Sequence, residues 1–344
     1  MSRLALLGLL LWVYPPHEAL AQPLLDWIAH TRGRMIDVYS PGDSEEHLLA
    51  TGLTMATLSR ASYRDDPADR RGLIEGAHFE EVHFADRSGT DAQALVVRDQ
   101  RALVVAFRGT EKNSARDNLL NFSAVTSLGV FRGAHAGFAS SVVSLAPSLT
   151  DVIREQRRQH GPLEVWLTGH SLGGAMAQIY AMHLRDVNVP VAGVVTFGSP
   201  APGKGDFSNL YGRLAERTHR FENDEDIIPC LPPDEMAWVQ NGHVHVLYED
   251  HADVYATGGS ECRSIPSALL GMPFCDARPK LRRALGFIFP GSTLSCEIPD
   301  PLVMFSDYLL DVLDGRGRSL HGIGVYRDRL AQRIPHRVVA LVGD

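Results

Sequence analysis

A glycine-flanked serine is the residue of this chain best suited to chemistry. The segment Val165–Ala175 reads Val-Trp-Leu-Thr-Gly-His-Ser-Leu-Gly-Gly-Ala, so an apolar run precedes Gly-x-Ser-x-Gly and a stretch with helical spacing follows it. A strand, a sharp turn and a helix in this order predict a nucleophile elbow that lifts the Ser171 hydroxyl above a sheet. Gly169 and Gly173 are required because a Cβ there would collide with the neighbouring strand or helix. A glycine turn without chemistry is the alternative.

A serine hydroxyl is a weak nucleophile at neutral pH, so it requires a base that is itself oriented by an acid. On a parallel α/β sheet the acid and then the histidine follow the serine in the chain. Asp226 is the predicted acid, because it follows a strand-like run and a proline-rich loop lies directly behind it. Its neighbours Asp224 and Glu225 are interpreted as solvated loop charges.

The base must come from 15 histidines, most of which are ordinary. His243 and His245 alternate along a predicted strand and suit sheet packing. His321 lies on a glycine-flanked turn just before the last predicted helix, which suits a base carried by a loop. We therefore predict His321 as the base and keep His251 as the alternative; His336 is the remaining late histidine.

An acyl transfer also needs two backbone donors directed at the tetrahedral intermediate. One is expected to be the N–H of Leu172, directly after the nucleophile. The other is expected at Thr110, after an early strand, with its hydroxyl as a third donor. His170 lies inside the elbow and is assigned a structural role.

Strands and helices that alternate along the chain must position these residues. The predicted strands are 79–84, 92–98, 102–107, 191–197, 218–221 and 244–248, and the clearer helices are 48–63, 139–160, 172–185 and 321–332. Such alternation predicts an α/β fold with a mostly parallel central sheet and helices on both faces. We expect one domain over residues 22–344, with an apolar segment at 111–132 and a Gly-, Pro- and Ser-rich insertion at 257–300.

Composition narrows the classes of function. The chain has 344 residues, 44% of them hydrophobic and 22% charged, which is typical of a globular protein with a sizeable core. A net charge of −8 argues against nucleic acid or an anionic membrane surface as a general partner. No metal or organic cofactor is expected, because a serine, histidine and aspartate triad needs neither.

The N-terminus has the pattern of a cleavable secretory signal. Arg3 precedes an apolar run over Leu4–Val13, and Ala19-Leu20-Ala21 offers a cleavage site before Gln22. About ten apolar residues are too few to span a bilayer, which needs about 20. We expect residues 1–21 to be removed and the protein to be secreted or periplasmic, with no transmembrane segment afterwards. An uncleaved anchor is the alternative.

Four cysteines suit an exported chain that forms disulfides. None has C-x-x-C spacing, so metal ligation is not expected, and the sequence does not choose among the three possible pairings. Buried free thiols are the alternative. The cysteines are Cys230, Cys262, Cys275 and Cys296.

Six short motifs occur in one order between about Leu48 and Tyr248. They are Ala61-Ser62-Tyr63, Val105-Ala106-Phe107-Arg108-Gly109-Thr110, His135-Ala136-Gly137-Phe138, the elbow from Thr168 to Ala175, Thr196-Phe197-Gly198-Ser199-Pro200 and the run from Asp226 to Pro232. Together they make the chain resemble the class 3 (fungal-type) triacylglycerol lipases of the α/β-hydrolase fold. Each motif alone is weak, whereas the joint match is specific.

The resemblance implies roles for individual residues. It makes Ser171 the nucleophile, Asp226 the acid and Thr110 the first oxyanion residue, and it makes residues 111–132 a lid. The family base usually opens a terminal helix with a tyrosine shortly after it, as His321 does with Tyr326; His251 with Tyr255 is a weaker match. Asp226 and His321 are 95 positions apart, which exceeds the spacing in the fungal enzymes, so the choice between the two histidines stays open.

The expected function is hydrolysis of carboxylic esters, most directly of glycerolipids at a lipid–water interface, by an exported serine hydrolase of the triacylglycerol lipase type. Phospholipase A1 and feruloyl or short-chain esterase activities use the same triad in this family and remain alternatives. A non-catalytic α/β-hydrolase module that binds a partner is a further alternative. A peptidase on the same fold has no support from the resemblance.

Overall fold

The computed structural model describes residues 22, 24–26, 28–29, 45–87, 92–109, 131–223, 226, 228–230, 238–247, 255–257 and 321–333. Several sequence predictions therefore lie outside the described residues. These are the signal at 1–21, Thr110, nearly all of the segment at 111–132, the insertion beyond residue 257, and His251 and His336. The cysteine pairing also lies outside them.

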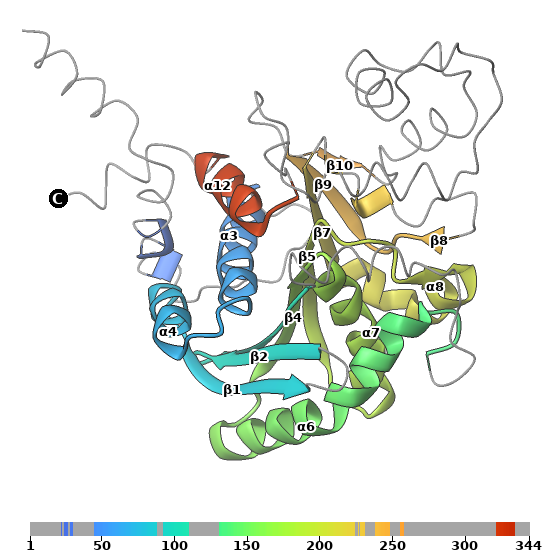
Figure 1. Ribbon diagram of the computed structural model, residues 1–344, viewed down its shortest axis with the longest axis horizontal. Helices are drawn as coiled ribbons and strands as arrows, with labels where there is room; N and C mark the ends of the chain where they lie inside the picture. The colour runs from blue at the N-terminus through green and yellow to red at the C-terminus, as the bar shows by residue number, and fades with distance from the viewer. Residues whose placement is uncertain are drawn as a thin grey trace, which may run out of the picture.

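A twisted eight-stranded sheet forms the centre of the described structure (Figure 1). In spatial order its strands are β1 (Glu80–Arg87), β2 (Ala92–Arg98), β3 (Ala102–Phe107), β4 (Glu164–His170), β5 (Val191–Phe197), β7 (Thr218–Asn223), β9 (His243–Leu247) and β10 (Tyr255–Thr257). The five strands from β3 to β9 are parallel, and β1, β2 and β10 join antiparallel. The predicted α/β fold with a mostly parallel sheet is confirmed.

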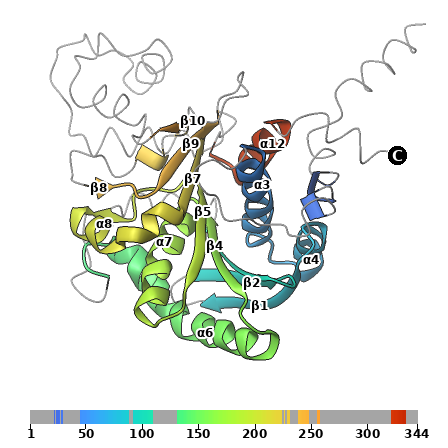
Figure 2. The ribbon, with the colours of Figure 1, turned by 180° about the vertical axis from the view of Figure 1, so that it is seen from behind.

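Helices cover both faces of the sheet, as Figures 1 and 2 show from opposite sides. One face is covered by α6 (Ala136–His160) and α7 (Leu172–Asp186), and the other by α3 (Glu45–Ala61), α4 (Pro67–Gly76) and α12 (Ile323–Arg333). The smaller elements are α8 (Gly205–Tyr211), the 3₁₀ turns η1 (Gly212–Arg217) and η2 (Ile228–Cys230), and the ribbon of β6 (Gly203–Lys204) with β8 (Trp238–Val239).

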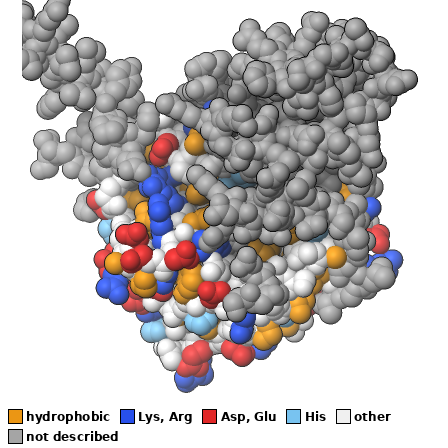
Figure 3. Space-filling model, viewed as in Figure 1, with side chains coloured by type: hydrophobic (Ala, Val, Ile, Leu, Met, Phe, Trp, Pro, Cys, Tyr) orange, Lys and Arg blue, Asp and Glu red, His pale blue; other side chains and the backbone are white. Residues whose placement is uncertain are grey.

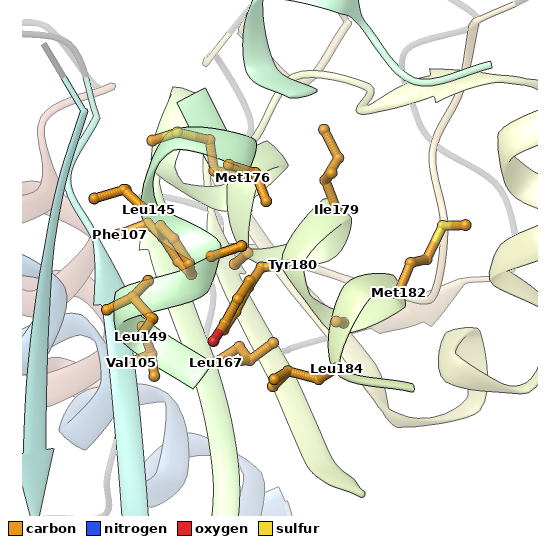
Figure 4. Close-up of a cluster of buried hydrophobic side chains, with 14 of the residues drawn as sticks. Val105, Phe107, Leu145, Leu149, Leu167, Met176, Ile179, Tyr180, Met182 and Leu184 are labelled. Atoms are coloured by element: carbon orange, nitrogen blue, oxygen red, sulfur yellow. The ribbon is translucent and has the colours of Figure 1, made fainter. Parts of the chain in front are cut away.

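Successive side chains of a strand point to opposite faces of the sheet, and both faces are covered by helices here. The central strands are therefore apolar throughout. In β3, Leu103, Val105 and Phe107 enter the core under α6 and α7, whereas Val104 and Ala106 enter the core under α3 and α12. Figure 4 shows part of the first core, with β3 and β4 side chains against those of the two helices: Val105, Phe107, Leu145, Leu149, Leu167, Met176, Ile179, Tyr180, Met182 and Leu184.

The helix α6 is long and apolar enough to cross a membrane by length and composition alone. The expectation that no segment beyond the N-terminus is long and apolar enough to be transmembrane is therefore wrong by this criterion. Its apolar residues Val142, Leu145, Leu149 and Ile153 recur at helical spacing and are buried against the sheet. Core packing therefore accounts for its apolar content.

The parallel strands place their carboxyl ends along one edge of the sheet. Gly109, Ser171 and Gly198 follow the ends of β3, β4 and β5 at this edge, and Asp226 follows β7. The helix α12 packs against α3, and the residues before it reach the same edge. On the face seen in Figure 3, acidic and basic side chains are interspersed over the described residues.

Candidate active site

Ser171 occupies a strained turn between β4 and α7. Its backbone has φ 58° and ψ −132°, a positive φ that non-glycine residues rarely adopt. The turn is held by a hydrogen bond from the Ser171 N–H to the Phe197 carbonyl at 2.9 Å and by another from the Gly174 N–H to the Ser171 carbonyl at 2.9 Å. The predicted strand, sharp turn and helix are confirmed.

The two glycines of the motif are required by close backbone approach. A Cβ on Gly169 would overlap the backbone of Gly173 in α7, and a Cβ on Gly173 would overlap the Phe107 carbonyl of β3. The elbow can therefore form only if both positions lack a side chain, as the sequence predicts.

Asp226 and His321 form a buried pair beside the elbow. The His321 Nδ1 lies 2.8 Å from the Asp226 Oδ2, and their side chains are 9% and 0% exposed. Asp226 also accepts hydrogen bonds from the Tyr326 hydroxyl at 2.6 Å and the Ile228 N–H at 3.0 Å. Burial raises the pKa of Asp226, but the charge of His321 and these hydrogen bonds outweigh it and hold that pKa below its ordinary value.

Gly198 lies against this pair. It has φ +54°, and a Cβ there would come within 2.6 Å of the Asp226 Oδ2 and 2.9 Å of both the His321 Nδ1 and the Tyr326 Oη. The turn after β5 thus approaches Asp226 and His321 so closely that only a glycine fits at this position.

His170 connects the elbow to the loop that carries His321. The His170 Nε2 donates to the backbone carbonyl of His321, and its Nδ1 lies 2.9 Å from the Tyr63 hydroxyl. The rings of His170 and His321 lie 4.6 Å apart between centroids. Burial, together with the nearby charge of His321, lowers the pKa of His170 to about 3. The expected structural role of His170 is consistent with these contacts.

The turn after β3 is held by Arg108. Its Nη1 donates to the Asp65 Oδ1 and the Gln93 Oε1, each at 2.5 Å. Thr110, the predicted oxyanion residue, follows this turn but lies outside the described residues. Leu172, the other predicted donor, is the first residue of α7, where backbone N–H groups have no partner within the helix.

Sequence reasoning missed the contacts of two tyrosines. Tyr63 contacts His170, and Tyr326 contacts Asp226. Tyr63 belongs to a motif that carried the resemblance, and Tyr326 is the tyrosine expected shortly after the base. These were the available signals, but neither tyrosine had an assigned contact. His243 and His245 do pack in the sheet, where each stacks on His219. Within the described ranges, no group of three or more His, Cys, Asp or Glu residues has a metal-binding arrangement.

Comparison with known proteins extends the resemblance. Residues 104–236 match the family model of class 3 lipases. A lipase of Rhizopus niveus is 29% identical over 163 residues, which cover 45% of this chain and 41% of the relative. A secreted mono- and diacylglycerol lipase of Fusarium solani is 27% identical over 150 residues, covering 43% and 44%. The matches thus span less than half the length of these relatives.

The structure of lipase II from Rhizopus niveus has the same fold. It superposes with a TM-score of 0.57 at 22% identity and covers 64% of this chain and 91% of that chain. The family match includes Ser171 and Asp226, whereas His321 lies beyond it. Residues 104–236 thus match the class 3 lipase family, and the described structure has the α/β-hydrolase fold of the fungal lipases.

Proposed function

We propose that the chain is an exported serine hydrolase that cleaves carboxylic esters of glycerolipids through an acyl-enzyme. Ser171 is the nucleophile, His321 the base and Asp226 the acid that orients it, and the N–H groups of Thr110 and Leu172 form the oxyanion hole. The observation that supports this most is the 2.8 Å contact between His321 and Asp226 at the same sheet edge as the strained Ser171.

In the acylation step the Ser171 Oγ bonds to the ester carbonyl carbon while the Nε2 of His321 accepts the hydroxyl proton. The Nδ1–H of His321 keeps donating its hydrogen bond to the Asp226 carboxylate, and the negative charge of the carboxylate stabilises the imidazolium. The carbonyl oxygen carries the negative charge until the intermediate collapses. The ester C–O bond then breaks and His321 returns the proton to the departing alcohol.

In the deacylation step water replaces the alcohol. His321 accepts a proton from the water as its oxygen bonds to the acyl carbon, and a second oxyanion forms at the same donors. Collapse releases the carboxylic acid and returns the proton to the Ser171 oxygen. The net reaction consumes one ester and one water and requires no cofactor.

The proposed substrate class and the proposed export are supported by the named relatives and by the sequence. The relatives are named as lipases, and one is named as a secreted mono- and diacylglycerol lipase. The apolar segment at 111–132 occupies the position of the family lid, and Leu4–Val13 has the character of a signal. An apolar lid that opens at an interface would expose a surface that water disfavours, so activity should rise above the solubility limit of the ester.

The test is hydrolysis of short- and long-chain p-nitrophenyl esters, an emulsified triacylglycerol and a phosphatidylcholine vesicle. The variants are Ser171→Ala, His321→Ala and His251→Ala, with Ser148→Ala and His160→Ala as matched controls on the far helix α6. We expect Ser171→Ala and His321→Ala to be inactive and the other three to retain activity.

Each other outcome has a definite meaning. An inactive His251→Ala with an active His321→Ala would move the base to the alternative histidine. Hydrolysis of the phospholipid in preference to the triacylglycerol would assign a phospholipase A1. A folded wild type that cleaves none of the four substrates would contradict the enzyme assignment and favour a binding module.

A further inference from the structure

The hydrogen bonds of His170 determine which of its nitrogens carries the proton. A carbonyl oxygen can only accept, so the Nε2 that contacts the His321 carbonyl must be protonated. The Nδ1 of the neutral ring is then an acceptor, and the Tyr63 hydroxyl at 2.9 Å must be its donor. The His321 carbonyl thus fixes the tautomer of His170, and the Tyr63 hydroxyl matches it by donating to Nδ1.

The surroundings of His170 favour the neutral ring. The side chain is buried, and burial is the largest cause that lowers its pKa to about 3. The ring is tilted by 36° over the His321 ring at 4.6 Å. A neutral ring at this distance does not repel His321 when His321 becomes an imidazolium. A lysine or arginine at position 170 would carry a positive charge and would repel it.

Tyr63 reaches a second part of the site. The Gly109 backbone hydrogen-bonds to its hydroxyl, and the Arg108 guanidinium lies 5.6 Å from its ring centroid. A Cβ on Gly109 would overlap the Tyr63 hydroxyl and lie 3.2 Å from the Ser171 Cβ. One side chain thus touches the turn after β3 and the elbow histidine together.

His321 needs an anchor besides Asp226. The hydrogen bond to Asp226 holds a single ring nitrogen, and His321 precedes α12 by only one residue, Gly322. A histidine held at one atom can still move its backbone and carry Nε2 away from the serine. The contact from His170 fixes the carbonyl of the same residue, so the ring and the backbone are held from two sides.

We propose that His170 and Tyr63 are positioning residues, which fix the backbone carbonyl of His321 and so keep its imidazole on Asp226 and aligned with Ser171. The chain of contacts runs from the Tyr63 hydroxyl to the His170 Nδ1 and from the His170 Nε2–H to the His321 carbonyl. The effect on rate rests on the proposed function, whereas the effect on the His321 ring does not.

The test compares His170→Leu, His170→Gln and Tyr63→Phe. Leucine removes the donor, whereas the glutamine side-chain amide places an N–H near the position of the imidazole Nε2 and retains it. Phenylalanine removes only the hydroxyl that donates to the His170 Nδ1. Tyr180→Phe is the matched control, since its hydroxyl bonds Thr150 on the opposite face of the sheet.

Two readouts separate the proposal from the proposed function. The first is kcat and KM on a p-nitrophenyl ester, with Ser171→Ala as the reference for loss of the nucleophile. The second is the downfield proton NMR resonance of the His321 Nδ1–H, recorded with each substitution added to Ser171→Ala, where no turnover occurs. Circular dichroism verifies that each variant is folded.

We expect kcat to fall on the order of 100-fold in His170→Leu and by less in Tyr63→Phe, with KM unchanged, because a small displacement of the base has this cost. His170→Gln should recover most of the lost kcat. The Nδ1–H resonance should be present in Ser171→Ala, broaden or vanish with His170→Leu and persist with His170→Gln.

Folded Tyr63→Phe and His170→Gln with the kcat of wild type, together with an unchanged resonance in His170→Leu, would overturn the proposal. If His170→Leu fails to fold, an unchanged kcat and an unchanged resonance in Tyr63→Phe overturn it alone. An inert wild type would instead overturn the proposed function, and the resonance would still decide the role of His170.

Discussion

His321 hydrogen-bonds to Asp226 at 2.8 Å although 95 residues separate them in the chain. Asp226 follows β7, and His321 precedes α12, which packs on α3 at the other face of the sheet. Both side chains are buried, so the contact requires that α3, α12 and the sheet are assembled together. The hydrogen bond between His321 and Asp226 therefore depends on the packing of α12 against α3.

Replacing Asp226 with asparagine should abolish most of the activity without unfolding the protein. If the amide oxygen keeps the hydrogen bond from the Ile228 N–H, the amide nitrogen faces the His321 Nδ1. It then favours the wrong tautomer of His321, which in a serine triad costs about 10⁴-fold in kcat. The measurement is kcat on a p-nitrophenyl ester with circular dichroism for the fold. Activity within tenfold of wild type would contradict Asp226 as the acid.

Gly198→Ala should disrupt the hydrogen bond between Asp226 and His321 by steric overlap alone. The new Cβ would lie 2.6 Å from the Asp226 Oδ2 and 2.9 Å from the His321 Nδ1, so the two must separate. Gly212→Ala is a matched control, because it has nearly the same φ, 53° against 54°, and nothing lies within 4 Å of its Cβ. Both variants should lose about 1–3 kcal/mol of unfolding free energy to backbone strain, but only Gly198→Ala should lose most of its kcat. Equal kcat in the two variants would show that the pair tolerates displacement.

The elbow, the central strands and Asp226 could be predicted because their signals are local. Gly169 and Gly173 lie on either side of the serine, and β3 is an unbroken apolar run. The helix expected over about 139–160 begins three residues earlier, at Ala136, and includes Gly137 in its first turn. Burial of Phe138 in the core stabilises that first turn despite the glycine.

The contacts around the base could not be predicted from local signals. Nothing near Tyr63 indicates that its hydroxyl meets His170, which is 107 residues away, and nothing near His170 indicates a bond to the His321 backbone. These contacts depend on how α3 and α12 pack, which is a tertiary property. The role of His321 as the base stays a prediction, as do the lid, the signal and Thr110.

Tyr326→Phe should destabilise the site and the fold together. The hydroxyl donates to the Asp226 Oδ2 at 2.6 Å and accepts from the Asn223 N–H at 3.1 Å, and the ring is fully buried. Loss of both bonds leaves a buried amide and a carboxylate oxygen with fewer partners, at a cost of about 1–3 kcal/mol. Urea unfolding measures this cost. Tyr211→Phe, whose hydroxyl bonds Thr218 far from Asp226, should lose stability but keep kcat.

Stability should fall as the pH drops below about 6.5. Burial lowers the pKa of His135 and His219 to about 4 and of His170 and His245 to about 3, from an ordinary value of 6.5. Between about pH 6.5 and pH 4 the unfolded chain therefore binds more protons than the folded one, and each such histidine contributes up to about 1.4 kcal/mol of destabilisation per pH unit. The stability that a histidine contributes by staying neutral is fully present above about pH 6.5 and is lost as the pH falls towards its folded-state pKa.

Urea unfolding at about pH 7.5 and about pH 5, on either side of the ordinary histidine pKa, measures this slope. His245→Gln should flatten it by close to one proton, because the substituted position no longer titrates. His160→Gln, at the exposed end of α6, is the matched control. An equal unfolding free energy at the two pH values would contradict a net uptake of protons by these histidines on unfolding.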